Sequence, residues 1–371
     1  MCEMTGISWQ DISVALLSLL DVASGAVLAL SFGFLLLPSA AGFIVGAVGS
    51  LLTGSITPVS FQQENLVLAT GLSKDIRPRI SMILFAAFLT GLLGLLGLPQ
   101  LVVDSVGPEI FLGMLAGVGL YLTKVGIDLA RDKLIIGIPC AIVALGVQIW
   151  TNNLVYAVTA SVPLGILIQW LLVKSGRSQV SEIKVPRYPG WLAGIRSEFR
   201  AIKPMVSVPV VVGALALATL TLGGNIAYTG VNLSMATDPV QTYNQVTTIS
   251  GLADFASSLF GGASMEVIVS ATAAAPHPVV SGALLMFGAA IVLLSGLIYT
   301  VAKYIPLSAM GGYLIAIGAV LVLPWNAMDA FESGNPIVVA LTMATTAFTN
   351  PFYGLVVGLI AKTVMSFFGV L

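Results

Sequence analysis

Charged residues are scarce in this chain. Only 8% of its 371 residues are Asp, Glu, Lys or Arg, whereas 57% are hydrophobic; a soluble domain carries about 25% charged residues. So few charges could not cover a water-exposed surface, which excludes a soluble globular protein. We expect a multi-pass protein of the cell membrane, surrounded by the lipid bilayer. The net charge is −1 and no basic cluster accompanies aromatic residues, so no nucleic-acid partner is expected.

Cysteine and histidine are nearly absent. Cys2 and Cys140 lie far apart and form no CxxC pair, and His277 is the single histidine, placed between two prolines. This excludes a disulfide framework and a Cys/His metal cluster, so we expect neither a metal nor a cofactor. We find no nucleophile–base pair and no phosphate-binding loop, so we predict no enzymatic activity.

Long apolar runs make up most of the chain. A span needs about 20 apolar residues, or fewer where a helix is broken, and on this basis we predict an all-α polytopic protein with about fourteen membrane segments. The first segment carries Asp11 and Asp21 without a preceding basic region, so we expect no cleavable signal peptide. The predicted segments are residues 12–37, 39–54, 55–72, 78–102, 108–130, 133–151, 153–173, 205–236, 240–260, 261–276, 279–302, 305–329, 335–349 and 351–370.

The polar stretch 174–204 divides the chain into two halves of seven segments each, with a short amphipathic helix expected near residues 191–199. Because seven is odd, the two halves must have opposite orientations in the membrane. The third segment of each half, within residues 54–72 and 260–278, is interrupted by Gly or Pro and then becomes apolar. Paired interrupted segments in corresponding positions indicate a transporter site built on inverted repeats.

Glu266 lies in the second interrupted segment, FGGASMEVIVSATAAAPHP. A carboxylate in a membrane segment is costly and is a functional candidate by default. We interpret it as a substrate acceptor or proton-coupling group; the alternative is a first-turn carboxylate that only caps N–H groups. Ser264 is the predicted N-cap of the half-helix and a second substrate-binding candidate.

Four polar residues open the first half-helix: Gln62, Gln63, Glu64 and Asn65. Amides offer both donors and acceptors, so Gln62, Gln63 and Asn65 are substrate-binding candidates, and Glu64 is a candidate for proton coupling. Four consecutive residues point to all sides of a helix, so some of them could merely cap it.

A polar stripe follows in the first span of the second half, TLGGNIAYTGVNLS. Asn225 and Tyr228 are predicted to line the site, because polar groups at helical spacing must face protein or a cavity in lipid. Ordinary interhelical hydrogen bonding is the alternative. Asp21, midway in the first span, is a third proton-coupling candidate.

The order of four motifs resembles the nucleobase–cation symporter-2 (xanthine/uracil permease) family, particularly its adenine/guanine/hypoxanthine permease-like branch. The motifs are LLTGSITPVSFQQENLVLA, PEIFLGMLAGVGLYLTKVGIDLA, GLADFASSLFGGASMEVIVSATA and the C-terminal stretch from GGYLIAIGAV onward. Together they extend over nearly the whole chain, although each is weak alone.

This resemblance implies a 7+7 inverted-repeat fold and a proton-coupled symporter of nucleobases that forms homodimers. Its substrate would lie between the paired half-helices and move with a core domain that slides against a gate domain. The implied boundaries are core 1–104, gate 105–173, inter-repeat loop 174–204, core 205–304 and gate 305–371. Glu266 falls near the carboxylate on the tenth segment that contacts the base in this family.

Two departures from the family pattern leave an alternative open. The family's acid on the eighth segment is replaced by Gly223-Gly224-Asn225, and its Gly-Leu-Asn motif by Gln63-Glu64-Asn65. The alternative is an organic or inorganic anion transporter of the same fold, of benzoate or sulfate type.

The membrane orientation predicted from charge conflicts with the orientation of that family. Thirteen of the fifteen Lys and Arg residues fall on one side of the membrane in the predicted segmentation. The positive-inside rule therefore places both termini outside, whereas the family has them inside.

Overall fold

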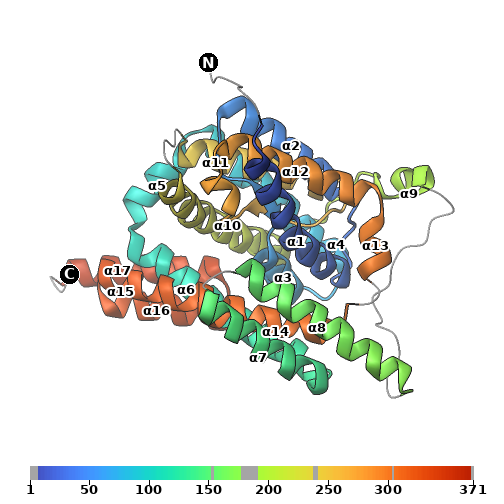
Figure 1. Cartoon of the computed structure of the whole chain (residues 1–371). Coiled ribbons are helices and arrows are strands. Elements are labelled where there is room, and N and C mark those ends of the chain that lie inside the picture. Colours follow the sequence, from blue (N-terminus) through green and yellow to red (C-terminus); the bar gives the residue numbers. More distant parts are fainter. Residues whose placement is uncertain (1–6, 152–153, 177–190, 237–240, 303–304, 369–371) are drawn as a thin grey trace.

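The computed structural model describes residues 7–151, 154–176, 191–236, 241–302 and 305–368. Its helices form two packed groups, one above the other in the view of Figure 1. The first group contains α1 (Trp9–Ser31), α2 (Ser39–Thr53), α4 (Ile76–Leu95), α10 (Val208–Met235), α11 (Tyr243–Ser258) and α12 (Pro278–Leu294). The second contains α6 (Pro108–Arg131), α7 (Leu134–Thr151), α8 (Leu154–Lys174), α14 (Leu307–Ala316), α15 (Leu323–Ser333), α16 (Pro336–Phe348) and α17 (Pro351–Phe367).

Short elements connect or interrupt these helices. Two of them, α5 (Leu98–Val106) and α13 (Leu297–Ala302), lead from the first group to the second. Each follows a glycine with positive φ, Gly97 or Gly296, a backbone conformation that glycine adopts at little cost. The interrupted segments are β1 (Val59–Phe61) with α3 (Gln63–Leu72), and β2 (Met265–Val267) with the 3₁₀ turn η1 (Ala271–Ala274). A π-helical turn, η2 (Ile317–Val322), joins α14 to α15.

The described helices include six that are long and apolar enough to cross a membrane. Shorter apolar helices, such as α2 and α12, accompany them. The prediction of a multi-pass helical membrane protein is therefore confirmed, whereas the count of fourteen spans is not. The amphipathic helix expected in the polar loop is present as α9 (Trp191–Glu198). Its last residue, Glu198, is buried and accepts hydrogen bonds from Leu37 N at 3.1 Å and Tyr299 Oη at 2.8 Å.

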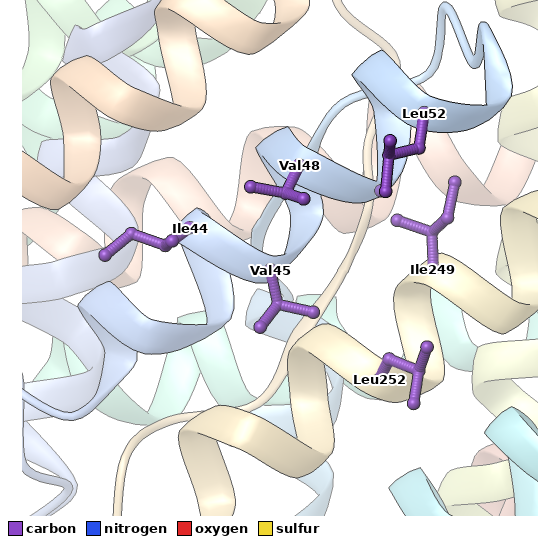
Figure 2. A pocket seen from close by; sticks show the side chains of 7 residues that line it. Ile44, Val45, Val48, Leu52, Ile249 and Leu252 are labelled. Carbon is purple, nitrogen blue, oxygen red and sulfur yellow. The ribbon is translucent and has the colours of Figure 1, made fainter.

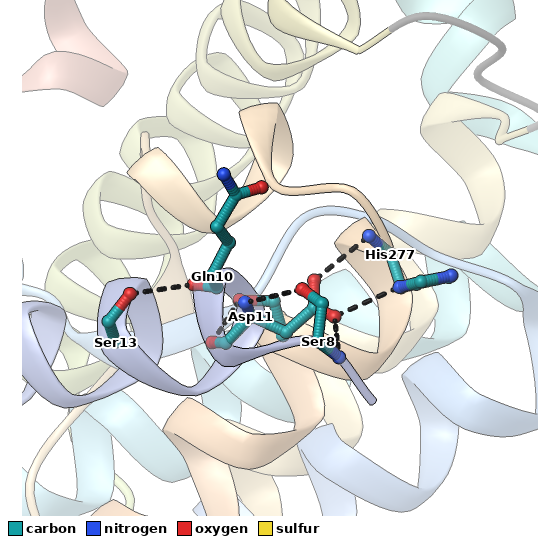
Figure 3. A network of polar contacts seen from close by, with 6 residues as sticks. Ser8, Gln10, Asp11, Ser13 and His277 are labelled. Carbon is teal, nitrogen blue, oxygen red and sulfur yellow. Dashed lines mark hydrogen bonds and ion pairs between the residues drawn. The ribbon is translucent and has the colours of Figure 1, made fainter. Parts of the chain in front are cut away.

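Two arginines near the start of α4 bind backbone carbonyls, one of them at the end of α1. Arg79 donates to Phe32 O at 2.8 Å, and Arg77 donates to Lys203 O at 3.2 Å. At the start of α1, Ser8 and Asp11 form a capping box. Asp11 is buried and also contacts His277 Nδ1 at 2.9 Å, as Figure 3 shows. His277, the N-cap of α12, thus ties the start of α12 to the start of α1.

Small residues bring α4 and α11 into close contact. Gly251 faces Gly91, and a Cβ at Gly251 would overlap the backbone of Gly91. Close approach of backbones through small residues is how membrane helices gain packing energy.

Replacing Gly251 with Ala should therefore destabilise the protein by about 1–3 kcal/mol, the usual cost of overpacking a core. We expect a lower apparent Tm in detergent, measured by intrinsic fluorescence. Gly146→Ala is the matched control, because Gly146 lies within α7 with open space around its Cβ position. An equal apparent Tm for the Gly251→Ala and Gly146→Ala variants would contradict the proposed packing role of Gly251.

Candidate functional site

The two interrupted segments meet as an antiparallel pair of strands. Val59 pairs with Val267, Ser60 with Glu266, and Phe61 with Met265. Gln62, the N-cap of α3, continues this contact, because its backbone N–H donates to Ser264 O at 3.1 Å. Segments about 200 positions apart in the chain are thus joined at one place. As expected from paired interruptions, residues from both halves of the chain build one polar centre.

The second segment differs from the sequence-based expectation. Glu266 lies on strand β2 and not in the first turn of a half-helix, and Ser264 is no N-cap. The reason is Asp254 on α11, whose two carboxylate oxygens accept from Ser264 Oγ at 3.2 Å and from Met265 N at 2.9 Å. These bonds and the pairing with β1 hold residues 264–267 extended. The only regular turn that follows is the four-residue η1.

Glu266 is completely buried at the centre of this arrangement. Its Oε1 accepts hydrogen bonds from Asn65 Nδ2 and Thr221 Oγ1. Asn65 Nδ2 also lies 3.1 Å from Thr221 Oγ1 and 3.3 Å from Ser264 Oγ. Glu266 Oε2 has no partner, and a Cβ at Gly224 would lie 3.8 Å from it. The carboxylate is therefore held by one oxygen and leaves the other available beside α10.

The polar stripe of α10 lies along β2 and the turn after it. Thr221 contacts Glu266, and three turns later Asn232 donates to Ile268 O at 2.8 Å and accepts from Ser270 N at 3.0 Å. Asn225 lies between these two contacts; it is 1% exposed, and neither atom of its amide has a partner. Tyr228 donates to Glu64 Oε1 at 3.3 Å. Thr221, Tyr228 and Asn232 of the stripe thus contact Glu266, Glu64 and the segment after β2, while the role of Asn225 and Tyr228 in substrate binding stays a prediction.

Gln63 points away from this centre. Its Nε2 donates to Tyr313 Oη on α14 at 2.7 Å and lies 3.5 Å from Ser24 Oγ on α1. It therefore bridges the two groups of helices rather than contacting Glu266, and its role in substrate binding stays a prediction. Asp21, the third candidate for proton coupling, lies outside the residues whose side chains are described.

Two residues close to Glu266 were not among the predicted site residues. Thr221 begins the polar stripe, and its spacing of four residues from Asn225 was a usable signal. Asp254 is a buried acid in the predicted segment 240–260, so the rule that flagged Glu266 could also have flagged it.

The site contains acids without basic partners. Glu64, Asp254 and Glu266 are all buried, and in the described part of the chain their recorded partners are hydroxyl, amide and backbone groups and one another. Hydroxyls and amides can bind either an anion or a neutral polar solute. Ionised carboxylates can accept but not donate, so the protonation of this cluster decides which solute fits.

An apolar groove of about 310 Å³ lies elsewhere, between α2 and α11. Figure 2 shows its aliphatic walls, among them Val48, Leu52 and Ile249. Because no charged or amide side chain lines it, this groove does not correspond to the predicted substrate site.

Comparison with known proteins gives the fold. Neither a family model nor a curated protein matches the sequence. Among solved structures, the transmembrane domain of the cyanobacterial bicarbonate transporter BicA aligns with a TM-score of 0.63 and 17% identity over 95% of this chain and 98% of that one. Murine SLC26A9, described as an anion transporter and seen in its inward-facing state, aligns with a TM-score of 0.67 and 15% identity over 99% of this chain and 70% of that one.

The chain therefore has the fold of these membrane transporters. The predicted resemblance to the nucleobase–cation symporter-2 family is wrong, because the matching structures are bicarbonate and anion transporters. The four motifs that suggested it describe where the broken segments and tight helix contacts lie. Positions of this kind reflect the fold more than the solute.

Proposed function

We propose that this protein is a secondary-active membrane transporter that carries a small anion together with a proton. The observation that carries the proposal is Glu266, a fully buried carboxylate with one free oxygen and no basic partner among its recorded contacts. It lies where β1, β2 and α10 meet. The fold of known anion transporters supports an anion as the solute.

Electrostatic repulsion indicates that Glu266 is protonated when the anion binds. Two like charges 4 Å apart repel by about 4 kcal/mol at an effective dielectric constant of 20. A typical hydrogen bond contributes about 1 kcal/mol, so one or two amide donors could not offset an ionised Glu266 beside an anion. A proton on the free Oε2 removes the repulsion and supplies another donor. The anion and the proton would then bind and leave together.

Movement is required because the site is closed. Glu266, Asn65 and Asn225 are each at most 1% exposed. We propose that the first group of helices is the core (residues 1–104 and 205–304) and the second group the gate (105–173 and 305–371), and that the core slides against the gate. The Gln63–Tyr313 hydrogen bond crosses between them and would have to break or exchange. Fourteen membrane segments and a homodimer complete the proposed assembly.

Purified protein in proteoliposomes should take up a small anion against its gradient when the outside is more acidic. The panel to test is bicarbonate, formate, benzoate, sulfate and chloride, with uracil and adenine as competitors that are expected to have no effect. Uptake should rise as the external pH falls, because the proton is a co-substrate, and should stop when a protonophore collapses the gradient. Uptake that persists after this collapse, or absence of uptake of every anion, would refute the proposal.

A further inference from the structure

The amide of Asn225 is unusual among the buried polar groups of the site. It is 1% exposed, yet neither Nδ2 nor Oδ1 has a hydrogen-bond partner. A buried polar atom that is left unsatisfied is costly. Because both atoms are free, this observation does not depend on which way the amide is turned.

The position of Asn225 relates it to the proposed solute. It lies one helical turn after Thr221, which binds Glu266 Oε1, and three residues before Tyr228, which binds Glu64. Residues three and four apart share one helix face. Asn225 therefore lies on the face of α10 that contacts both acids, next to Gly224, whose missing side chain leaves space toward Glu266 Oε2.

The donor and the acceptor of the Asn225 amide can distinguish anions that carry an O–H from anions that do not. Nδ2 can donate to an anion's oxygen, but Oδ1 can only accept. An aprotic anion such as nitrate, sulfate or chloride leaves Oδ1 unpaired and places negative charge against it. An oxyanion that carries an O–H beside a free oxygen satisfies both atoms at once, in a cyclic pair of hydrogen bonds.

Building on the proposed function, we infer that Asn225 is a specificity-determining residue and that the transported solute is a protic oxyanion of the bicarbonate or dihydrogen phosphate type. Glu266 carries the coupled proton, while the Asn225 amide forms hydrogen bonds with the solute's O–H and with the oxygen beside it. Aprotic anions bind less well because they leave the acceptor Asn225 Oδ1 without a hydrogen-bond donor. An unpaired Oδ1 that costs about 1.4 kcal/mol corresponds to about a tenfold preference for the protic anion.

Two pairs of anions isolate this O–H group. Bicarbonate and nitrate share a planar shape and a single charge, and dihydrogen phosphate and perchlorate share a tetrahedral shape and a single charge. In proteoliposomes with an acidic exterior, wild-type uptake of at least one protic anion should exceed that of its aprotic counterpart about tenfold. Thermal shift of purified protein with the same four anions, buffered at one pH, provides a measurement independent of carbon dioxide leakage.

Variants of Asn225 test the assignment. Asn225→Leu should reduce uptake of the protic anion and bring the ratio close to one, and Asn225→Ser, which keeps a group that both donates and accepts, should restore part of the preference. Asn326→Leu on α15 is the control, because that amide donates to Val322 O at 2.6 Å and should leave the ratio unchanged.

Equal wild-type uptake of both members of each pair would overturn the inference, as would an unchanged ratio in Asn225→Leu and Asn225→Ser. Because the wild-type comparison needs no variant, the inference can be refuted even if Asn225→Leu does not fold. Proton-driven uptake without discrimination would refute only this inference. Absence of proton-dependent uptake of any anion would instead refute the proposed function.

Discussion

Glu266→Gln is expected to abolish proton-driven accumulation of the anion while leaving the protein folded. Glutamine keeps the size of the side chain and a carbonyl oxygen, which can still accept from Asn65 and Thr221 as Oε1 does. It resembles a permanently protonated Glu266 that cannot release its proton. Loss of a coupling free energy of up to about 3 kcal/mol corresponds to a decrease of about 150-fold.

The measurement must separate coupling from binding. Net uptake driven by a proton gradient should decrease strongly in Glu266→Gln, whereas exchange of anion for anion across the membrane, which moves no net proton, should continue. Glu332→Gln at the exposed end of α15 is the control and should behave as wild type. Gradient-driven uptake that survives in Glu266→Gln, or that is lost instead in Glu64→Gln alone, would assign the proton to another residue.

Asp254→Ala should have the largest effect on the integrity of the site. It removes the acceptor of Met265 N–H and of the Ser264 hydroxyl, both inside the protein. Each buried donor left unsatisfied costs about 1–3 kcal/mol. Because β2 is only three residues long, the loss of these two bonds should weaken the pairing of Ser60 with Glu266.

We therefore expect Asp254→Ala to lower the apparent Tm in detergent more than any surface variant and to abolish both net uptake and exchange. Asp254→Asn is the matched variant: its carbonyl can still accept from Met265 N–H, and its NH₂ can donate to Ser264 Oγ. It should retain most of the stability and of the exchange activity. If the apparent Tm of Asp254→Ala equals that of the wild type, β2 does not depend on this carboxylate.

Local sequence signals located much of the site. The scarcity of charge made each buried acid conspicuous, which pointed to Glu266 and Glu64. Gly and Pro marked the two breaks, and the spacing of Asn225 and Tyr228 placed both on one face of α10. The structure joins the two broken segments at Glu266 and Tyr228 to Glu64, while the role of these residues in transport stays a prediction.

Other features depend on partners distant in the chain. Gln63 and Asn65 are two residues apart, yet Gln63 turns to Tyr313 on α14 and Asn65 to Glu266. Sequence alone could not separate them, because both are amides in the first turn of the same helix. The family resemblance was wrong for a related reason: weak motifs recorded the breaks and close helix contacts of the fold but not the solute.

The sequence by itself determined that this is a multi-pass membrane protein with two interrupted segments and a buried acid at the second, since hydrophobicity, Gly and Pro act locally. Only the tertiary structure decided that Glu266 lies on a strand, that Asp254 holds that strand, and that the amide of Asn225 is buried and unpaired. Those features arise from hydrogen bonds between α11 and β2, between β1 and β2, and between α3, α10 and β2. They form when segments from both halves of the chain pack together and exclude water, which no local pattern records.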